Sequence, residues 1–260
     1  MARGKHSKKN KKKIYRLIQL LLIIVIIVAV IYIYKYIVDK NNAQKETELL
    51  NDIEVNKTEV TKQKTERMLQ VSELKKENED IVGWIEIEGT KVNNPVLQGT
   101  DNSFYMNHDY KKKESVYGSL FLDESYDWNK PSSNLLIYGH NMRDGSMFQN
   151  LLNYREEDYY KKHPIIRFTT EDEDAEFEVM AAFQSRVYYK SEKNVFRYYY
   201  FIDANNEEEY NEFVNNAKKA SFYDTGVTAE YGDQLITLST CSYHTEDGRF
   251  VVVGKKKDKN

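Results

Sequence analysis

Apolar and polar positions follow three patterns along the chain. Residues 17–34 form an apolar run without a formal charge, close to the ~20 residues that a helix needs to cross a bilayer. Residues 39–80 are rich in Lys, Glu, Asn and Thr, with only scattered apolar positions. From residue 81 onward, short apolar or alternating runs are separated by acidic or Gly-containing turns, which is typical of strands. The chain is therefore predicted to hold a membrane anchor, a stalk and a β-rich domain at residues 81–257.

Seven segments of the β-rich region are predicted to be strands. They are residues 84–89, 118–122, 135–138, 165–169, 177–183, 234–238 and 250–253. Many short strands at moderate spacing predict a β-barrel or a sandwich. Two other segments have helical spacing, residues 147–154 continuing to 160 and residues 207–220. The second of these helices lies in a long insertion between two predicted strands.

The groups around the N-terminal apolar run predict its orientation. Eight basic residues and no acidic residue precede it. Positive charge stays on the cytoplasmic side, so residues 1–16 are predicted to be a cytoplasmic tail. Residues 17–38 would then be a transmembrane signal-anchor, with the remainder of the chain outside the cell. A cleaved signal peptide is the alternative, but its apolar region is shorter, about 7–15 residues, and ends at a small-residue cleavage site. No such site follows this run.

Residues 39–80 are interpreted as an extracellular stalk that ends in a helix. Met68, Val71 and Leu74 recur at helical spacing, and no Gly or Pro interrupts the segment.

The net charge of −3 is unevenly distributed along the chain, because the first 38 residues carry nine basic residues and no acidic one. The remaining chain has 41 acidic residues against 29 basic ones. An acidic body argues against nucleic acid as its partner.

The single cysteine, Cys241, follows the predicted strand at residues 234–238. One cysteine excludes a disulfide framework and a multi-cysteine metal site, and no cofactor is expected. A free thiol outside the cell risks oxidation or stray pairing. It could pair two chains, be buried and inert, or be a nucleophile. A nucleophilic thiol needs a cation or a histidine that favours the thiolate, and a donor that stabilises an oxyanion.

His140 and Arg249 have predicted positions that fit these two tasks. His140 directly follows a predicted strand and precedes a Gly-containing turn, which would place it at a barrel rim. Arg249 opens the last predicted strand. If this strand pairs with the preceding one, Cys241 and Arg249 face each other across the mouth of the hairpin. A surface Arg249 paired with a neighbouring acidic residue is the alternative. His244, three residues after Cys241, would need a turn to reach the thiol.

Three motifs in chain order resemble those of the sortase family. They are YGHN at 138–141, TLSTC at 237–241 and GRFVVVGK at 248–255. Sortases carry a His, a Cys in a TLxTC motif and an Arg on the following strand, in this order. Each motif is weak alone, but the ordered set behind an N-terminal anchor is specific. The N-terminal helix, the helix-bearing insertion and the stretch NSFYMNHDY are most similar to class B members.

The resemblance implies a mainly β fold with helices (α+β), in which a closed eight-stranded β-barrel carries an N-terminal helix and a helix-bearing insertion behind one transmembrane helix. It also implies a cysteine transpeptidase on the outer face of a Gram-positive cell membrane. Such an enzyme cleaves a C-terminal sorting motif of a secreted protein, NPxTx-like or a variant, through a thioester. An amine of cell-wall peptidoglycan then resolves the thioester.

The resemblance also implies roles for individual residues. Cys241 would be the nucleophile, His140 the acid and base, and Arg249 the group that stabilises the oxyanion or holds the substrate backbone. Three further residues are expected to line the substrate groove: Ser239, Asn102 and Met106. Some class B members have acidic residues directly after the Cys. Here Ser242 and Tyr243 follow it, so no catalytic carboxylate is assigned.

Two other functions compete with this interpretation. A cell-wall cysteine peptidase would release its product to water, but such enzymes usually place the Cys before the His in the chain. Here His140 precedes Cys241. A membrane-tethered binding module without enzymatic activity would leave the thiol inert. An added amine acceptor separates the first alternative from a transpeptidase, and a thiol-reactive probe separates the second.

Overall fold

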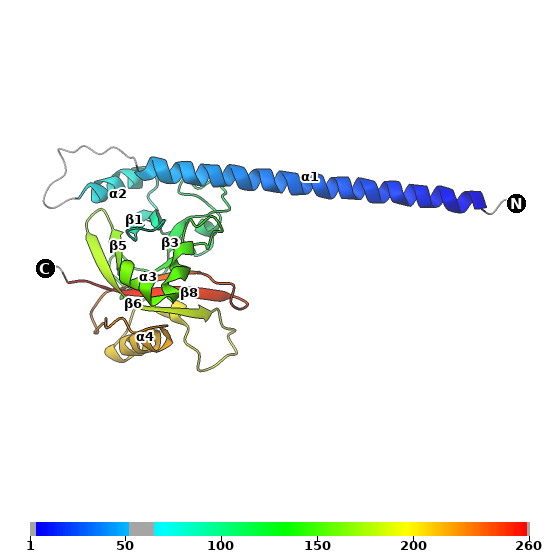
Figure 1. Ribbon diagram of the computed structural model, residues 1–260. Coiled ribbons are helices and arrows are strands. Elements are labelled where there is room, and N and C mark those ends of the chain that lie inside the picture. The colour runs from blue at the N-terminus through cyan, green and yellow to red at the C-terminus, as the bar shows by residue number, and fades with distance from the viewer. Residues whose placement is uncertain (1–3, 52–64, 259–260) are drawn as a thin grey trace. The chain divides into compact units, whose positions relative to one another are not determined.

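A computed structural model of the protein describes residues 4–51 and 65–258. They belong to two compact units, Met1–Glu46 and Thr47–Asn260. The first unit is built on α1 (Gly4–Asn51), a continuous helix (Figure 1). Among the described residues, it is the one helix that is long and apolar enough to cross a membrane.

The predicted anchor at residues 17–38 is therefore helical, and α1 continues past it into the predicted stalk. The part of the stalk at residues 52–64 lies outside the described residues, as do the first three residues of the predicted tail. The helix expected at the end of the stalk is present as α2 (Glu66–Glu77). Thr65 caps it, because its side chain accepts a hydrogen bond from the Met68 N–H at 3.3 Å.

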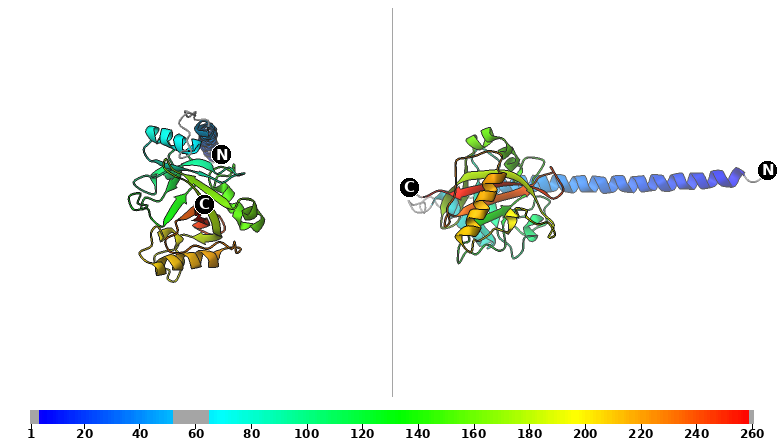
Figure 2. Two further views of the ribbon diagram at one scale, coloured as in Figure 1. Left: turned by 90° about the vertical axis from the view of Figure 1, so that its left-hand side faces the viewer. Right: turned by 90° about the horizontal axis from the view of Figure 1, so that it is seen from below.

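The second unit contains eight strands that close into a barrel in the order β1-β2-β3-β4-β7-β8-β6-β5 (Figures 1 and 2). The strands are β1 (Ile81–Glu86), β2 (Asn93–Leu97), β3 (Leu120–Leu122), β4 (Asn134–Tyr138), β5 (Ile165–Thr169), β6 (Asp174–Arg186), β7 (Leu235–Cys241) and β8 (Gly248–Lys256). The β2–β3 and β4–β7 pairs are parallel, and the other neighbours are antiparallel. The closed eight-stranded barrel with helices is thus confirmed.

Alternation of apolar and polar residues explains which face of each strand is buried. In β6, Ala175, Phe177 and Val179 are buried, while Glu176 and Glu178 between them are partly exposed. The barrel interior is filled by apolar side chains from every strand, including Phe177. A well-packed interior makes the barrel a rigid support for the loops at its rims.

Helices cover two opposite sides of the barrel (Figures 1 and 2). α2 packs against β1 and β5, and α4 (Glu207–Ala220) packs against β6. α4 matches its predicted bounds, since Asn206 caps its N-terminus and its buried residues recur at helical spacing. Those residues are Tyr210, Phe213, Val214 and Ala217. The helix-bearing insertion between β6 and β7 is therefore a packed part of the domain.

The structure corrects several predicted boundaries. The predicted strand at 118–122 begins only at Leu120, because Gly118 has a φ of 56°, outside the extended region. The first strand begins at Ile81 instead of residue 84, and Ile87 already belongs to the following turn, where its N–H donates to Val92 O at 2.9 Å. β2 was not predicted. It contains Pro95, which lacks an N–H, but β3 pairs only with the two residues that follow this proline.

The continuous helix predicted over residues 147–160 is wrong. The structure has a 3-10 helix, η2 (Gln149–Arg155), followed by the short helix α3 (Glu157–Lys162). Met147 has a φ of 52°, so helical geometry cannot begin there. Glu156 is extended, with φ −96° and ψ 123°, and separates the two helices.

Candidate active site

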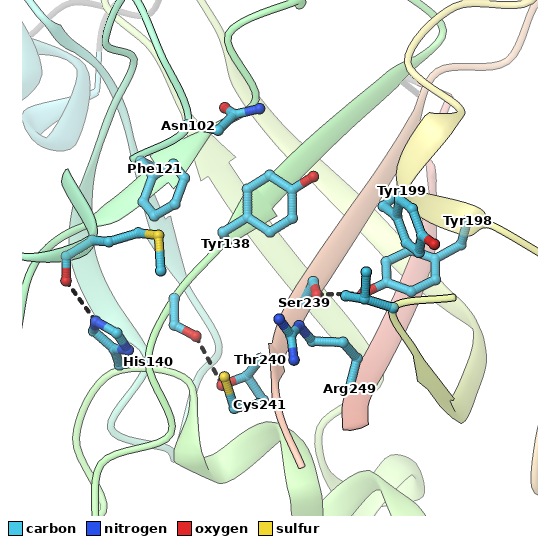
Figure 3. A pocket seen from close by; sticks show the side chains of 13 residues that line it. Asn102, Phe121, Tyr138, His140, Tyr198, Tyr199, Ser239, Thr240, Cys241 and Arg249 are labelled. Atoms are coloured by element: carbon cyan, nitrogen blue, oxygen red, sulfur yellow. Dashed lines mark hydrogen bonds between the residues drawn. The ribbon is translucent and has the colours of Figure 1, made fainter. Parts of the chain in front are cut away.

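A pocket of about 250 Å³ opens where β4 and β7 end. It is lined by all six residues singled out in the sequence: Asn102, Met106, His140, Ser239, Cys241 and Arg249 (Figure 3). These residues are far apart in the chain, and the barrel topology brings them together. The roles assigned to them by resemblance remain predictions.

The parallel pairing of β4 with β7 explains why His140 and Cys241 meet. Tyr138, the last residue of β4, pairs with Ser239 of β7. His140 lies two residues after Tyr138, and Cys241 lies two residues after Ser239. Both therefore reach the same rim of the barrel. In Figure 3, Cys241 lies between His140 and Arg249.

Cys241 and Arg249 are direct cross-strand neighbours in the β7–β8 hairpin. The adjacent Ser242 N–H donates to Gly248 O at 2.9 Å. Because hydrogen-bonded and non-hydrogen-bonded pairs alternate, Cys241 and Arg249 form a non-hydrogen-bonded pair, in which cross-strand side chains are closer. The pairing expected from the sequence is present, and it places a fixed cation beside the thiol.

The Arg249 guanidinium is only partly engaged by the protein. Nη1 donates to Asp247 O at 3.1 Å and to Gly248 O at 3.0 Å. Within residues 4–51 and 65–258, Arg249 has no carboxylate partner, so the ion pair considered in the sequence analysis does not form there. Nε and Nη2 are left to donate to a bound group, and an arginine fork suits a carbonyl oxygen or an oxyanion.

The half-buried His140 imidazole is oriented by a backbone carbonyl. Its Nε2 lies 2.6 Å from Met106 O (Figure 3). A carbonyl oxygen only accepts, so Nε2 must carry the hydrogen in the neutral ring. Nδ1 is then the atom free to take up or release a proton. No carboxylate hydrogen-bonds or pairs with His140 in the described part of the chain.

The three expected groove residues reach the pocket in different ways. Met106 is 48% exposed, and its carbonyl also holds His140. Ser239 is buried, and its Oγ lies 2.7 Å from the Tyr198 hydroxyl. Asn102 is tied to Asp123 and to the backbone of Glu124.

A buried polar network behind the pocket was not found from the sequence. The Asp123 carboxylate accepts hydrogen bonds from Asn102 Nδ2 at 2.9 Å and from the Tyr138 hydroxyl at 3.0 Å. Asp123 is 5% exposed. Burial, followed by the Asp123 charge, raises the pKa of Tyr138. Tyr138 therefore stays protonated and remains a donor to Asp123.

The segment between β6 and α4 supplies the other wall of the pocket and was also missed. Val187, Tyr198 and Tyr199 line it, and Tyr198 is 1% exposed. Burial raises the pKa of Tyr198, so its hydroxyl stays protonated beside Ser239. The segment is rich in tyrosine, but it has no helical or strand periodicity that would have placed those side chains.

Ser242, the residue directly after Cys241, takes part in a separate contact. It is 4% exposed, and its Oγ lies 2.9 Å from His244 Nδ1. The β7–β8 turn thus brings His244 to Ser242. His244 does not line the pocket that holds Cys241.

Comparison with known proteins agrees with this geometry. A family model described as the sortase domain matches residues 85–257. The sortase B of Staphylococcus aureus is 34% identical over 188 residues, which cover 72% of this chain and 74% of that protein. The chain therefore belongs to the sortase family, and its relatives are of class B.

Solved structures give the same result. The Staphylococcus aureus sortase B–substrate complex superposes with a TM-score of 0.64 at 32% identity, covering 74% of this chain and 86% of that one. A sortase B complexed with triglycine has a TM-score of 0.70 at 30% identity, with coverages of 85% and 98%. Sortases are cysteine transpeptidases, so this chain is an enzyme and the interpretation as an inert binding module is set aside.

Proposed function

We propose that this sortase cleaves a sorting motif at a Thr–x bond and joins the new end to an amine of the cell wall. The observation that carries the proposal is the arrangement at one rim. Cys241 and Arg249 are paired across β7 and β8, and His140 follows the parallel neighbour β4. A thiol, an acid–base group and an oxyanion donor are the three parts that acyl transfer needs.

In the proposed first step, the Cys241 thiolate attacks the Thr carbonyl carbon and forms a tetrahedral oxyanion. Arg249 donates to that oxyanion through Nε–H or Nη2–H, which its backbone contacts do not use. As the C–N bond breaks, the imidazolium of His140 gives its Nδ1 proton to the leaving amine. A thioester on Cys241 remains.

In the proposed second step, an incoming amine attacks the thioester carbonyl. Neutral His140 takes a proton from that amine through Nδ1, and the thiolate leaves as the amide forms. The Met106 carbonyl holds Nε2–H in both steps, so the same ring atom faces the reaction each time. The relative solved with triglycine supports an amine as the acceptor.

The polar groups of the pocket support a motif that contains an asparagine, as in NPxTx. Asn102 Nδ2 uses one hydrogen on Asp123, which leaves one N–H to donate. The Tyr138 hydroxyl donates to Asp123, which leaves its oxygen to accept. One donor and one acceptor, both oriented by Asp123, match the C=O and NH₂ of a side-chain carboxamide. We propose that this pair recognises the motif's asparagine.

The proposed location follows from α1 and the charge pattern. Residues 17–38 would span the membrane, with the basic residues 1–16 in the cytoplasm. The stalk at residues 39–80 would hold the catalytic domain, residues 81–257, near the outer membrane surface. Secreted proteins with a sorting motif and peptidoglycan precursors would meet it there. Proteolysis of intact cells should therefore remove the catalytic domain and spare the basic tail.

The test is a cleavage and ligation assay on the full chain in detergent micelles. A library of peptides that varies the motif is offered with and without triglycine, and products are identified by mass spectrometry. We expect cleavage after Thr, a ligated product with triglycine, and a preference for Asn over Leu at the first motif position. Hydrolysed peptide alone, at every triglycine concentration, would contradict the proposed transfer and give the chain the hydrolytic activity of the peptidase alternative.

A further inference from the structure

The rim holds one more contact between the segments that carry His140 and Cys241. Asn141 Nδ2 donates to the backbone carbonyl of Cys241 at 3.0 Å. β7 extends to Cys241, but β4 ends at Tyr138. The Cys241 carbonyl therefore points to where β4 no longer continues as a strand, and a side chain satisfies it.

This contact continues the β4–β7 ladder by one step. Gly139 N–H donates to Ser239 O at 3.1 Å. Bonds of a parallel ladder recur at every second residue, so the next pair in register joins residue 141 to the carbonyl of residue 241. The backbone turns away first, since Phe148 N–H donates to His140 O at 2.9 Å and Asn141 pairs with Met147. The side-chain amide of Asn141 therefore takes the place of its backbone N–H.

His140 lies between these two bonds, and a third contact reinforces them. The Thr240 hydroxyl donates to Gly139 O at 2.8 Å. The chain on both sides of His140 is thus tied to the last three residues of β7, through the Gly139 backbone on one side and the Asn141 side chain on the other. The separation between the imidazole and the thiol depends on both ties, and Asn141 provides the one nearer to Cys241.

We propose that Asn141 is a positioning residue, which sets His140 against Cys241 by replacing a missing rung of the β4–β7 ladder. The proposal rests on the catalytic roles proposed above for these two residues. Asn141 itself does not line the pocket, so it acts through the backbone and not on the substrate.

The side-chain chemistry makes the proposal specific. A carboxamide donates to a carbonyl, whereas an ionised carboxylate of nearly the same shape cannot donate. Asn141→Asp therefore removes the bond with little change in volume, and Asn141→Ala removes the side chain. Protonation of the new carboxyl restores a donor, with an ordinary Asp pKa of about 3.9.

The experiment measures single-turnover thioester formation by the full chain with a cleavable sorting peptide. Asn141→Ala and Asn141→Asp are compared with wild type, with rates normalised to folded protein. Loss of alignment should lower the acylation rate by about 10²-fold at neutral pH, with the peptide KM unchanged. The rate ratio of Asn141→Asp to Asn141→Ala should rise as pH falls toward about 4.

Asn150→Ala is the matched control. Asn150 also uses its side chain on a backbone group, accepting from Lys91 N–H at 2.9 Å, but it lies on η2 away from the pocket. It should acylate at the wild-type rate.

A wild-type acylation rate in Asn141→Ala would overturn the proposal. So would a loss equal in Asn141→Ala and Asn141→Asp at every pH. If wild type itself forms no thioester, the proposed function fails, which is a distinct result from a normal wild type with unaffected variants.

Discussion

The two sides of the pocket are held in different ways. On one side, Cys241 and Arg249 lie on β7 and β8, and regular backbone pairing sets their distance. On the other side, residues 187–206 form no strand. Backbone bonds tie them down near their two ends, from Val187 N–H to Asp247 O at 3.0 Å and from Asn134 N–H to Ile202 O at 2.9 Å, and side-chain contacts hold the part between. Tyr188 N–H donates to the Tyr199 hydroxyl at 3.0 Å, and Arg197 donates to the Tyr189 carbonyl at 2.7 Å.

The two sides of the pocket therefore differ in what they contribute to the site. Two of the groups proposed to carry out chemistry, Cys241 and Arg249, lie on paired strands, where misplacement by a fraction of an ångström is resisted by the whole barrel. The third, His140, directly follows the end of β4 and is tied to β7. Val187, Tyr198 and Tyr199 shape the pocket from a segment whose middle is held by individual side chains, and single substitutions can reshape such a segment without disturbing the barrel. Substitutions on the strand side should therefore change kcat, and those on the segment side should change KM and selectivity.

The largest effect is expected for Arg249. Arg249→Ala removes the proposed oxyanion donor and should lower kcat by about 10²–10³-fold with the fold intact. Arg249→Lys keeps the charge but loses the planar fork, so it should recover only part of the activity. Steady-state kinetics with the sorting peptide and triglycine measure both.

The control for Arg249 is Arg167→Ala on β5. Arg167 is paired with Glu176 at 2.9 Å and is remote from the pocket. It should retain wild-type kinetics. Full activity in Arg249→Ala would remove the guanidinium from the mechanism and break the contrast between the two sides.

A smaller effect is expected for Tyr198, which joins the segment to β7. Tyr198→Phe leaves the buried Ser239 hydroxyl without its partner and should cost about 1–3 kcal/mol of stability. We expect a higher KM with kcat nearly unchanged, because the pocket wall loosens while the strand pairing remains. Tyr200→Phe is the control, since Tyr200 is 67% exposed. A fall in kcat without a change in KM would assign Tyr198 to the chemistry.

A weaker effect again is expected at the base of the segment. Arg186 forms an ion pair with Glu192. Arg186→Met should change stability by only about 0–1 kcal/mol, as for most partly exposed pairs. It should nevertheless narrow the difference in kcat/KM between Asn- and Leu-containing motifs, because the segment is less firmly placed. An unchanged preference would show that the segment does not influence motif selection.

The smallest predicted effect concerns pH and His244. Desolvation of the imidazole, followed by the charge of Arg155, lowers the pKa of His244 in the folded state, although the residue as a whole is exposed. The neutral form is favoured on folding, so this stabilisation is complete above the ordinary His pKa of about 6.5. It is lost as pH falls from there through the folded pKa. His244→Gln should therefore show a shallower fall in Tm between about pH 7 and pH 5 than wild type. Parallel Tm curves would contradict this.

The sequence was sufficient for the strand side of the site. Cys241 and Arg249 are separated by one short turn, so two adjacent strand patterns already predict that they face each other. The segment side was not predictable in this way. Tyr198 lies in a stretch without periodicity, and its position depends on contacts with Ser239 and its tyrosine neighbours.

Long-range features were harder to predict for a different reason. Asn141 reaches Cys241 across 100 residues, and that contact follows only once β4 and β7 are known to be parallel neighbours. β2 was missed because Pro95 argues against a strand. The register with β3 shows why the proline is tolerated, since β3 pairs only with the two residues that follow it. The resemblance to the sortase motifs already predicted His140 at the site, whereas the β4–β7 pairing that places it there was not predicted from the sequence.

Thioester formation on Cys241 is tested most directly by intact-mass spectrometry of the full chain trapped during turnover with a sorting peptide. The proposed mechanism predicts an adduct equal to the peptide up to its Thr, which peptide mapping should locate on Cys241. Added triglycine should remove the adduct and yield ligated peptide, and Cys241→Ala should form no adduct. An adduct on another residue, or normal ligation by Cys241→Ala, would contradict it.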